Sequence, residues 1–129
     1  MLHLIPVTLL YGGLNALFVL FLGLNVSRLR ATSVGVTKPL PPELVRPVRA
    51  HGNAAEWVPL ALFLLLALEL SGAANALALH LFGGLLLLAR VLHAAGVYRR
   101  SRLQVAGATL NYLVVLAMAV RAVAAHFSR

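Results

Sequence analysis

The stretch from Arg49 to Leu70 reads RAHGNAAEWVPLALFLLLALEL, and it decides the fold class. Its second half is almost entirely apolar, whereas its first half carries Arg49, Asn53 and Glu56. An apolar run of this kind is typical of a membrane-spanning helix, which needs roughly 20 mainly apolar residues. Ionisable groups at such a depth are costly unless they face a bundle interior or a watery cavity. The stretch therefore predicts a membrane helix with a polar site at one end.

The composition of the whole chain agrees with a membrane protein. The chain has 129 residues, of which 61% are hydrophobic and 11% are charged, and its mean hydropathy is +0.92. A soluble domain would carry about 25% charged residues. There is no cysteine, which excludes a disulfide framework and a cysteine nucleophile. The histidines lack the paired spacing of metal ligands, so we expect no metal. The net charge of +8 lies in clusters between apolar segments, and we therefore expect no nucleic-acid partner.

Four apolar segments predict four transmembrane helices. We place them at about residues 2–27, 42–70, 74–97 and 103–127. The first segment has no positively charged start and is long for a signal peptide, so we interpret it as a retained helix. The predicted fold is an all-α four-helix membrane bundle, with residues 1–129 forming a single transmembrane domain.

Basic residues predict how the bundle is oriented in the membrane. The first loop and the adjoining start of the second helix contain Arg28, Arg30, Lys38, Arg46 and Arg49, and the third loop contains Arg99, Arg100 and Arg102. The second loop, SGAAN, contains no lysine or arginine, and only Arg121 and Arg129 favour the other side. The positive-inside rule then places the first and third loops in the cytoplasm and both termini outside. We expect an integral protein of a bacterial inner membrane.

Polar residues within the second and third helices share one face of each helix. The steps from Arg46 to Arg49, Asn53 and Glu56 are three, four and three residues, which places them along one face. They can form a structural network in which Glu56 pairs with Arg49 or with Arg90 of the next helix. The surplus of guanidinium groups over one carboxylate instead suits an anionic ligand that also carries an ammonium group.

The motif of the second helix resembles that of the MAPEG family, the membrane-associated proteins in eicosanoid and glutathione metabolism. The family pattern R-A-x-x-N-x-x-E is matched by Arg49, Ala50, Asn53 and Glu56, and an upstream E-x-x-R is matched by Glu43 and Arg46. The segment ARVLH on the third helix, with Arg90 and His93, adds to the resemblance. The resemblance implies a homotrimer with sites for glutathione between neighbouring subunits, near the cytosolic face of the membrane.

Roles for individual residues follow from this resemblance. It implies that Arg102, at the start of the fourth helix, stabilises the glutathione thiolate, since a nearby cation favours the anion. Arg99 and Arg100 are alternatives for this role. The residues that the resemblance implies for binding glutathione are Arg28, Arg30, Arg49, Asn53, Glu56, Arg90, His93 and Tyr98.

The chain departs from the family pattern at two aromatic positions. Trp57 stands where eicosanoid synthases often have tyrosine, and Val97 stands where they have another, with Tyr98 one residue later. For Tyr112 on the fourth helix we expect an interhelical hydrogen bond. Glu69 is expected at the end of the second helix, in water.

These observations predict a glutathione-dependent transferase or peroxidase that acts on hydrophobic small molecules drawn from the membrane lipid. The alternative is a non-catalytic lipid-binding or scaffold protein on the same fold. A small multidrug exporter also has four helices, but it would use an acidic residue in its first helix, and residues 2–26 contain none.

Overall fold

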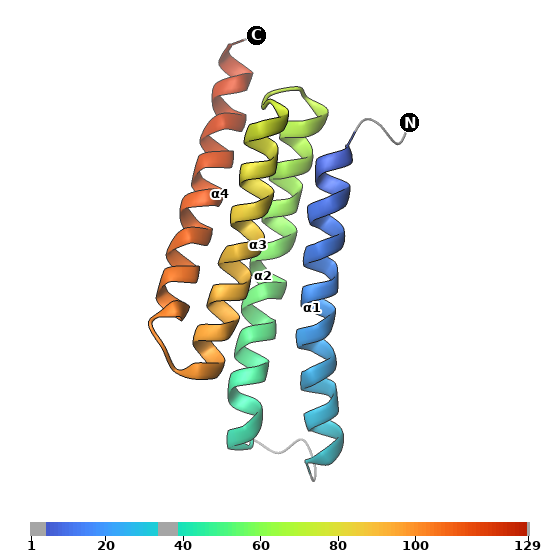
Figure 1. The fold of residues 1–129 in the computed structure, drawn as a ribbon, viewed down its shortest axis with the longest axis vertical. Coiled ribbons are helices and arrows are strands. Elements are labelled where there is room, and N and C mark those ends of the chain that lie inside the picture. Colours follow the sequence, from blue (N-terminus) through green and yellow to red (C-terminus); the bar gives the residue numbers. More distant parts are fainter. Residues whose placement is uncertain (1–4, 34–38, 129) are drawn as a thin grey trace.

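Four long helices form the protein. The computed structural model describes residues 5–33 and 39–128, and within them the helices are α1 (Pro6–Thr32), α2 (Pro42–Leu70), α3 (Ala76–Arg99) and α4 (Leu103–Phe127) (Figure 1). Each is long and apolar enough to cross a membrane. Large hydrophobic side chains such as Phe63 and Phe21 remain exposed, which suits a surface that faces lipid. The prediction of an all-α four-helix membrane bundle is confirmed.

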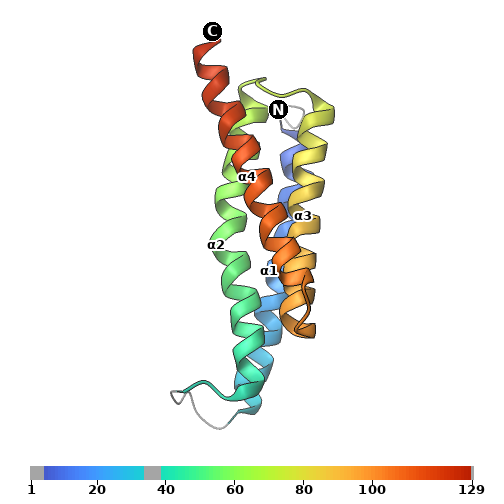
Figure 2. The same cartoon turned by 90° about the vertical axis from the view of Figure 1, so that its left-hand side faces the viewer.

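The two middle helices hold the bundle together. α2 and α3 contact each other, α1 packs against both of them, and α4 packs against both from the opposite side (Figure 1). Figure 2 views the bundle with α4 toward the reader; within the described residues α4 makes no contact with α1. The last residues of α1 and α3 and the first residues of α2 and α4 lie at one end of the bundle, and the α2–α3 connection lies at the other (Figure 1). We call the first of these the basic end, because it carries Arg28, Arg30, Arg46, Arg49, Arg99, Arg100 and Arg102.

The predicted helix bounds agree closely for α2 and α4 and less closely for the others. α1 continues to Thr32 rather than to residue 27, so Arg28 and Arg30 are on the helix and not in a loop. Of the expected first helix, residues 2–4 lie outside the described residues, as does Lys38 of the first loop. α3 begins two positions later than expected because Asn75 caps it, accepting a hydrogen bond from the Ala78 backbone N–H at 2.9 Å.

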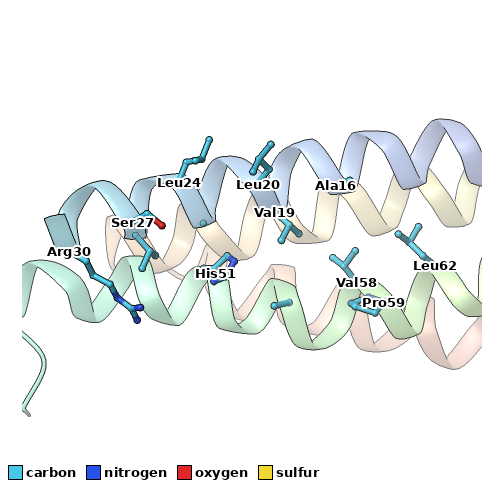
Figure 3. Close-up of a pocket in the computed structure, with 13 residues that line it drawn as sticks. Ala16, Val19, Leu20, Leu24, Ser27, Arg30, His51, Val58, Pro59 and Leu62 are labelled. Atoms are coloured by element: carbon cyan, nitrogen blue, oxygen red, sulfur yellow. The ribbon is translucent and has the colours of Figure 1, made fainter. Parts of the chain in front are cut away.

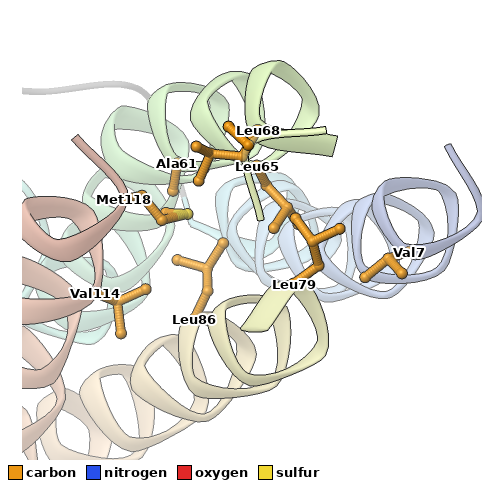
Figure 4. Close-up of a cluster of buried hydrophobic side chains, with 9 residues drawn as sticks. Val7, Ala61, Leu65, Leu68, Leu79, Leu86, Val114 and Met118 are labelled. Atoms are coloured by element: carbon orange, nitrogen blue, oxygen red, sulfur yellow. The ribbon is translucent and has the colours of Figure 1, made fainter. Parts of the chain in front are cut away.

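Small residues allow the helices to approach closely. A Cβ added at Gly107 of α4 would collide with the backbone of Ala89 and His93 of α3, and one at Gly96 would collide with the start of α4. Such close approach is the usual way in which membrane helices associate. A buried apolar cluster, which includes Leu65, Leu86 and Met118, fills the half of the bundle away from the basic end (Figure 4).

A carboxylate of α2 caps the beginning of α1. The Val7 backbone N–H donates to Glu69 Oε1 at 2.9 Å, and the Thr8 N–H donates to Glu69 Oε2 at 2.7 Å. The first amides of a helix have no acceptor within the helix, and its N-terminus carries partial positive charge, so a carboxylate there stabilises it. Glu69 lies at the end of α2 as expected and remains partly exposed. Its contact with α1 was not predicted, because a distant partner is not visible from the local sequence.

Candidate functional site

Arg90 is the most deeply buried charged residue among those that the structure describes. Its side chain is 2% exposed, and its Nη1 donates a hydrogen bond to Asn53 Oδ1 at 2.7 Å. No acceptor in residues 5–33 and 39–128 reaches Arg90 Nε. His93, three residues further along α3, is also buried. A buried guanidinium that has only a neutral amide partner is expensive, and an anion that completes its hydrogen bonds would relieve that cost.

Two other motif residues of α2 are exposed, unlike this buried arginine. Arg49 and Glu56 are exposed on the same face of α2 that carries Asn53. The hydrogen bond of Arg90 goes to Asn53, so the alternative in which Glu56 pairs with Arg90 is not the contact that the described residues make. Arg102 is exposed at the N-cap of α4. The structure thus leaves one carboxylate and two guanidinium groups of the predicted site available to a ligand or to another subunit.

An aromatic pair links α2 and α4 close to these residues. The rings of Trp57 and Tyr112 lie 5.1 Å apart, centroid to centroid, with their planes inclined at 60°. Trp57 directly follows Glu56 in the chain. Tyr112 thus packs against an aromatic ring of another helix in a tilted arrangement, a contact that its position in an apolar run did not predict.

A groove runs between α1 and α2 on another side of the bundle. Its volume is about 940 Å³, and it is lined by Ala16, Val19, Leu20, Gly23, Leu24, Val26, Ser27, Arg30, His51, Ala55, Val58, Pro59 and Leu62. Most of these side chains are apolar, and the polar ones, including Arg30 and His51, gather toward the basic end (Figure 3). The His51 ring packs against Gly23, where a Cβ would come within 3.1 Å of His51 Nε2.

The groove and the motif face are on different sides of α2. His51 is two residues from both Arg49 and Asn53, a separation of about 200° around the helix. Arg30 and His51 therefore lie on one face of the protomer, whereas Arg49, Asn53 and Glu56 lie on another. The position of His51 between the motif residues, on the opposite helix face, is the signal that could have identified it from the sequence.

Two more of the predicted residues, Arg28 and Tyr98, lie in a third region, where Asn25 links them. Arg28 Nη2 donates to Asn25 Oδ1 at 3.1 Å, and Asn25 Nδ2 donates to the Tyr98 hydroxyl at 2.8 Å. Arg46 Nη1 donates to the Tyr98 carbonyl oxygen at 3.2 Å. These residues line a cavity of about 610 Å³ at the basic end, together with Arg100. The Tyr98 side chain thus points toward α1 and not toward Arg90.

The fold and the site define an integral membrane protein of four helices with a cluster of arginines and polar residues at one end. A model of the MAPEG family matches residues 8–124. The chain is similar to the inner membrane protein YecN of Escherichia coli K12, with 36% identity over 95 residues that cover 73% of this chain and 72% of the relative. The same protein of the Escherichia coli O6:H1 strain CFT073 matches equally well. The chain belongs to the MAPEG family.

Proposed function

We propose that the protein is a glutathione-dependent membrane transferase or peroxidase, active as a homotrimer. The observation that carries the proposal is Arg90, a buried guanidinium with an unused Nε, held by Asn53 of the family motif. Glutathione suits such a place because it brings two carboxylates for arginines and an ammonium group for Glu56. Family membership supports the same class of chemistry, since the family takes its name from eicosanoid and glutathione metabolism.

The proposed site requires two copies of the chain. Of the residues implied for glutathione, Arg30 lies on the groove face, beside His51, whereas Arg49, Asn53 and Glu56 lie on the motif face. The two faces of α2 point in nearly opposite directions, so a change of side-chain rotamer within one protomer cannot bring both to the same ligand. A neighbouring subunit that presents its groove face to the motif face brings them together. A rotationally symmetric ring of this kind closes and repeats the site at every interface.

The proposed reaction uses the thiolate of glutathione as the nucleophile. Arg102, exposed at the basic end, lowers the free energy of the thiolate relative to the thiol, since a nearby cation favours the anion. In the transferase reaction, sulfur bonds to an electrophilic carbon as a leaving group departs with the electron pair. In the peroxidase reaction, two glutathione molecules supply two electrons and end as a disulfide, while the hydroperoxide becomes an alcohol and water. The apolar groove gives a hydrophobic substrate access from the lipid.

We further propose that the basic end faces the cytoplasm, where glutathione is abundant, with both termini on the other side of the inner membrane. The surplus of arginine at this end supports the orientation.

Calorimetry of the detergent-purified protein with glutathione tests the proposal, together with turnover of 1-chloro-2,4-dinitrobenzene. Both binding and conjugation are expected. Arg90→Lys is the informative variant, because it keeps the charge but loses the planar fork of donors, and it should weaken glutathione binding. A trimer that neither binds glutathione nor turns over the electrophile would favour the non-catalytic lipid-binding or scaffold function.

A further inference from the structure

We propose that the cavity between the ends of α1 and α3 and the beginning of α2 binds the phosphate headgroup of an anionic phospholipid. The cavity measures about 610 Å³ and lies at the basic end of the bundle. Arg28, Arg46 and Arg100 line it, from three different helices or their ends, with Glu43 as the acidic residue among the lining side chains. Three guanidinium groups and one carboxylate leave a surplus of positive charge, because arginine stays protonated in proteins.

The hydrogen bonds in the cavity hold the arginines in place without neutralising them. Arg28 donates to the amide oxygen of Asn25, and Arg46 donates to the backbone carbonyl of Tyr98. The Tyr98 hydroxyl accepts a hydrogen bond from Asn25, and this bond joins α1 to α3 along one wall of the cavity. Since these acceptors are neutral, each guanidinium keeps donors for a phosphate, whose oxygens suit the planar fork of arginine.

The backbone at Arg100 is consistent with a role in binding. Arg100 adopts φ = 52° and ψ = 43° at the C-cap of α3, and it is the one non-glycine residue with positive φ in the described part of the chain. Glycine is the usual residue in this left-handed conformation, because a side chain there is strained. The chain carries an arginine at this position, and the arginine lines the cavity.

An adjoining groove on α1 identifies the ligand as a lipid. Asn25 and Arg28 also line a smaller groove of about 320 Å³ whose other walls are Leu24 and Phe21. Leu24 and Phe21 are 59% and 67% exposed, and they lie up to two turns deeper along the helix than Arg28. The two cavities therefore share Asn25 and Arg28, with a cationic end beside an apolar continuation toward the membrane interior. A phosphate joined to an acyl chain matches both parts, and basic pockets between membrane helices recognise such headgroups.

This inference assigns Arg28 and Tyr98 to the lipid, and it does not depend on the proposed glutathione chemistry. It is tested by native mass spectrometry of the full chain released from detergent. Phosphatidylglycerol and phosphatidylcholine with identical acyl chains are compared, and phosphatidylglycerol is expected to bind preferentially. Arg28→Gln and Arg46→Gln should each reduce this preference roughly fivefold.

Two further variants separate the site from general effects. Arg100→Gly removes a guanidinium while giving the backbone its preferred residue, so the preference should fall without loss of thermal stability. Arg99→Gln removes the same charge from the same end at an exposed residue outside the cavity, and it should leave the preference unchanged. An equal loss in Arg99→Gln and Arg28→Gln would overturn the proposal, because the surface potential alone would then explain the selectivity.

Soluble glycerol phosphate and Phe21→Ala test the contribution of the acyl chain. Glycerol phosphate should bind more weakly than phosphatidylglycerol, and Phe21→Ala should weaken the lipid but not the soluble phosphate. If glycerol phosphate binds as tightly as the lipid, the cavity takes free phosphate and the lipid assignment is wrong.

Discussion

At the scale of single residues, Arg90 and Glu56 have opposite charges and opposite environments. Arg90 is enclosed between α2 and α3 with Asn53 as its partner, whereas Glu56 is exposed one turn further along α2. A buried cation of this kind is retained only where something compensates it. In the proposed complex, a carboxylate of glutathione compensates Arg90 and its ammonium group meets Glu56, so the two residues need not pair with each other.

Glu56→Gln is therefore expected to weaken glutathione binding sharply. In the proposed complex, a neighbouring subunit covers Glu56, which is exposed in the single protomer, and the substitution removes the charge that faces the ammonium group. Truncating one member of a buried charged pair costs roughly 2–5 kcal/mol. Calorimetric titration with glutathione measures the loss. Glu43→Gln, which removes the same charge from the first turn of α2, serves as the matched control and should bind glutathione normally. Equal affinities of Glu56→Gln and wild type would remove Glu56 from the site.

Arg102→Ala is expected to affect the sulfur and leave binding largely intact. Without the cation, the pKa of the bound thiol should rise and turnover at neutral pH should fall. Part of the rate should return at alkaline pH, where the thiolate forms without help. The ultraviolet absorbance of the bound thiolate across a pH series gives the pKa directly. An unchanged thiol pKa would transfer the role to Arg99 or Arg100.

The sequence could identify the motif residues but not their partners. Regular spacing predicted that Arg49, Asn53 and Glu56 share a face of α2, because helical periodicity is a local property. Whether Arg90 contacts Asn53 or Glu56 depends on the axial register of α3 against α2. No local sequence pattern specifies this register. Tyr112 was not identified as a neighbour of Trp57, because an aromatic residue in an apolar run gives no signal of its own.

At the scale of helices, apolar length predicts the membrane segments better than it predicts where each helix ends. The apolar run of α1 stops near residue 27, but the hydrogen-bonded helix continues to Thr32. Long basic side chains such as Arg28 and Arg30 can lie along a helix and reach the interface, so they need not end it. The bounds of α2 were predicted well because prolines mark its beginning and a serine and a glycine follow its end.

The contact of Glu69 with α1 predicts a stability effect that is independent of function. In Glu69→Gln the side chain keeps one acceptor for the Val7 and Thr8 amides and loses the charge beside the helix N-terminus. Hydrogen bonds to charged groups contribute about 1.5–3 kcal/mol, so a loss of that order is expected. The melting temperature in detergent measures it. Glu43→Gln should shift it less, because Glu43 is exposed and its hydrogen bond from Ser33 is long, at 3.4 Å. Equal shifts would contradict the capping role.

At the scale of the whole molecule, the fold places most of the arginines at one end and predicts the orientation of the bundle. The chain contains no cysteine, so single cysteines report their positions without background. Thr32→Cys, at the basic end, and Ser71→Cys, at the other, should react with membrane-impermeant reagents from opposite sides of the inner membrane. We expect Thr32→Cys to be labelled from the cytoplasm. Labelling of both from one side would contradict four spanning helices.

The division of polar residues between two faces predicts that subunits share each site. Arg30→Ala removes a guanidinium group from the groove face, and Glu56→Gln removes a carboxylate from the motif face. Each variant alone should therefore be nearly inactive. In trimers assembled from both variants, some interfaces join an intact groove face to an intact motif face. With equal and random mixing, about one quarter of the interfaces are of this kind in a closed ring. Coexpression with two affinity tags and purification through both tags yields such mixed trimers.

Turnover of the mixed trimers then decides where the site lies. About one quarter of the wild-type rate should return if the two faces come from neighbouring subunits, somewhat more after selection for mixed assemblies. A site within one subunit gives no recovery, since every chain carries one damaged face. Recovery is thus possible only through contact between copies, because Arg30 of α1 and His51 of α2 line a groove on a different face of the protomer from Arg49 and Glu56.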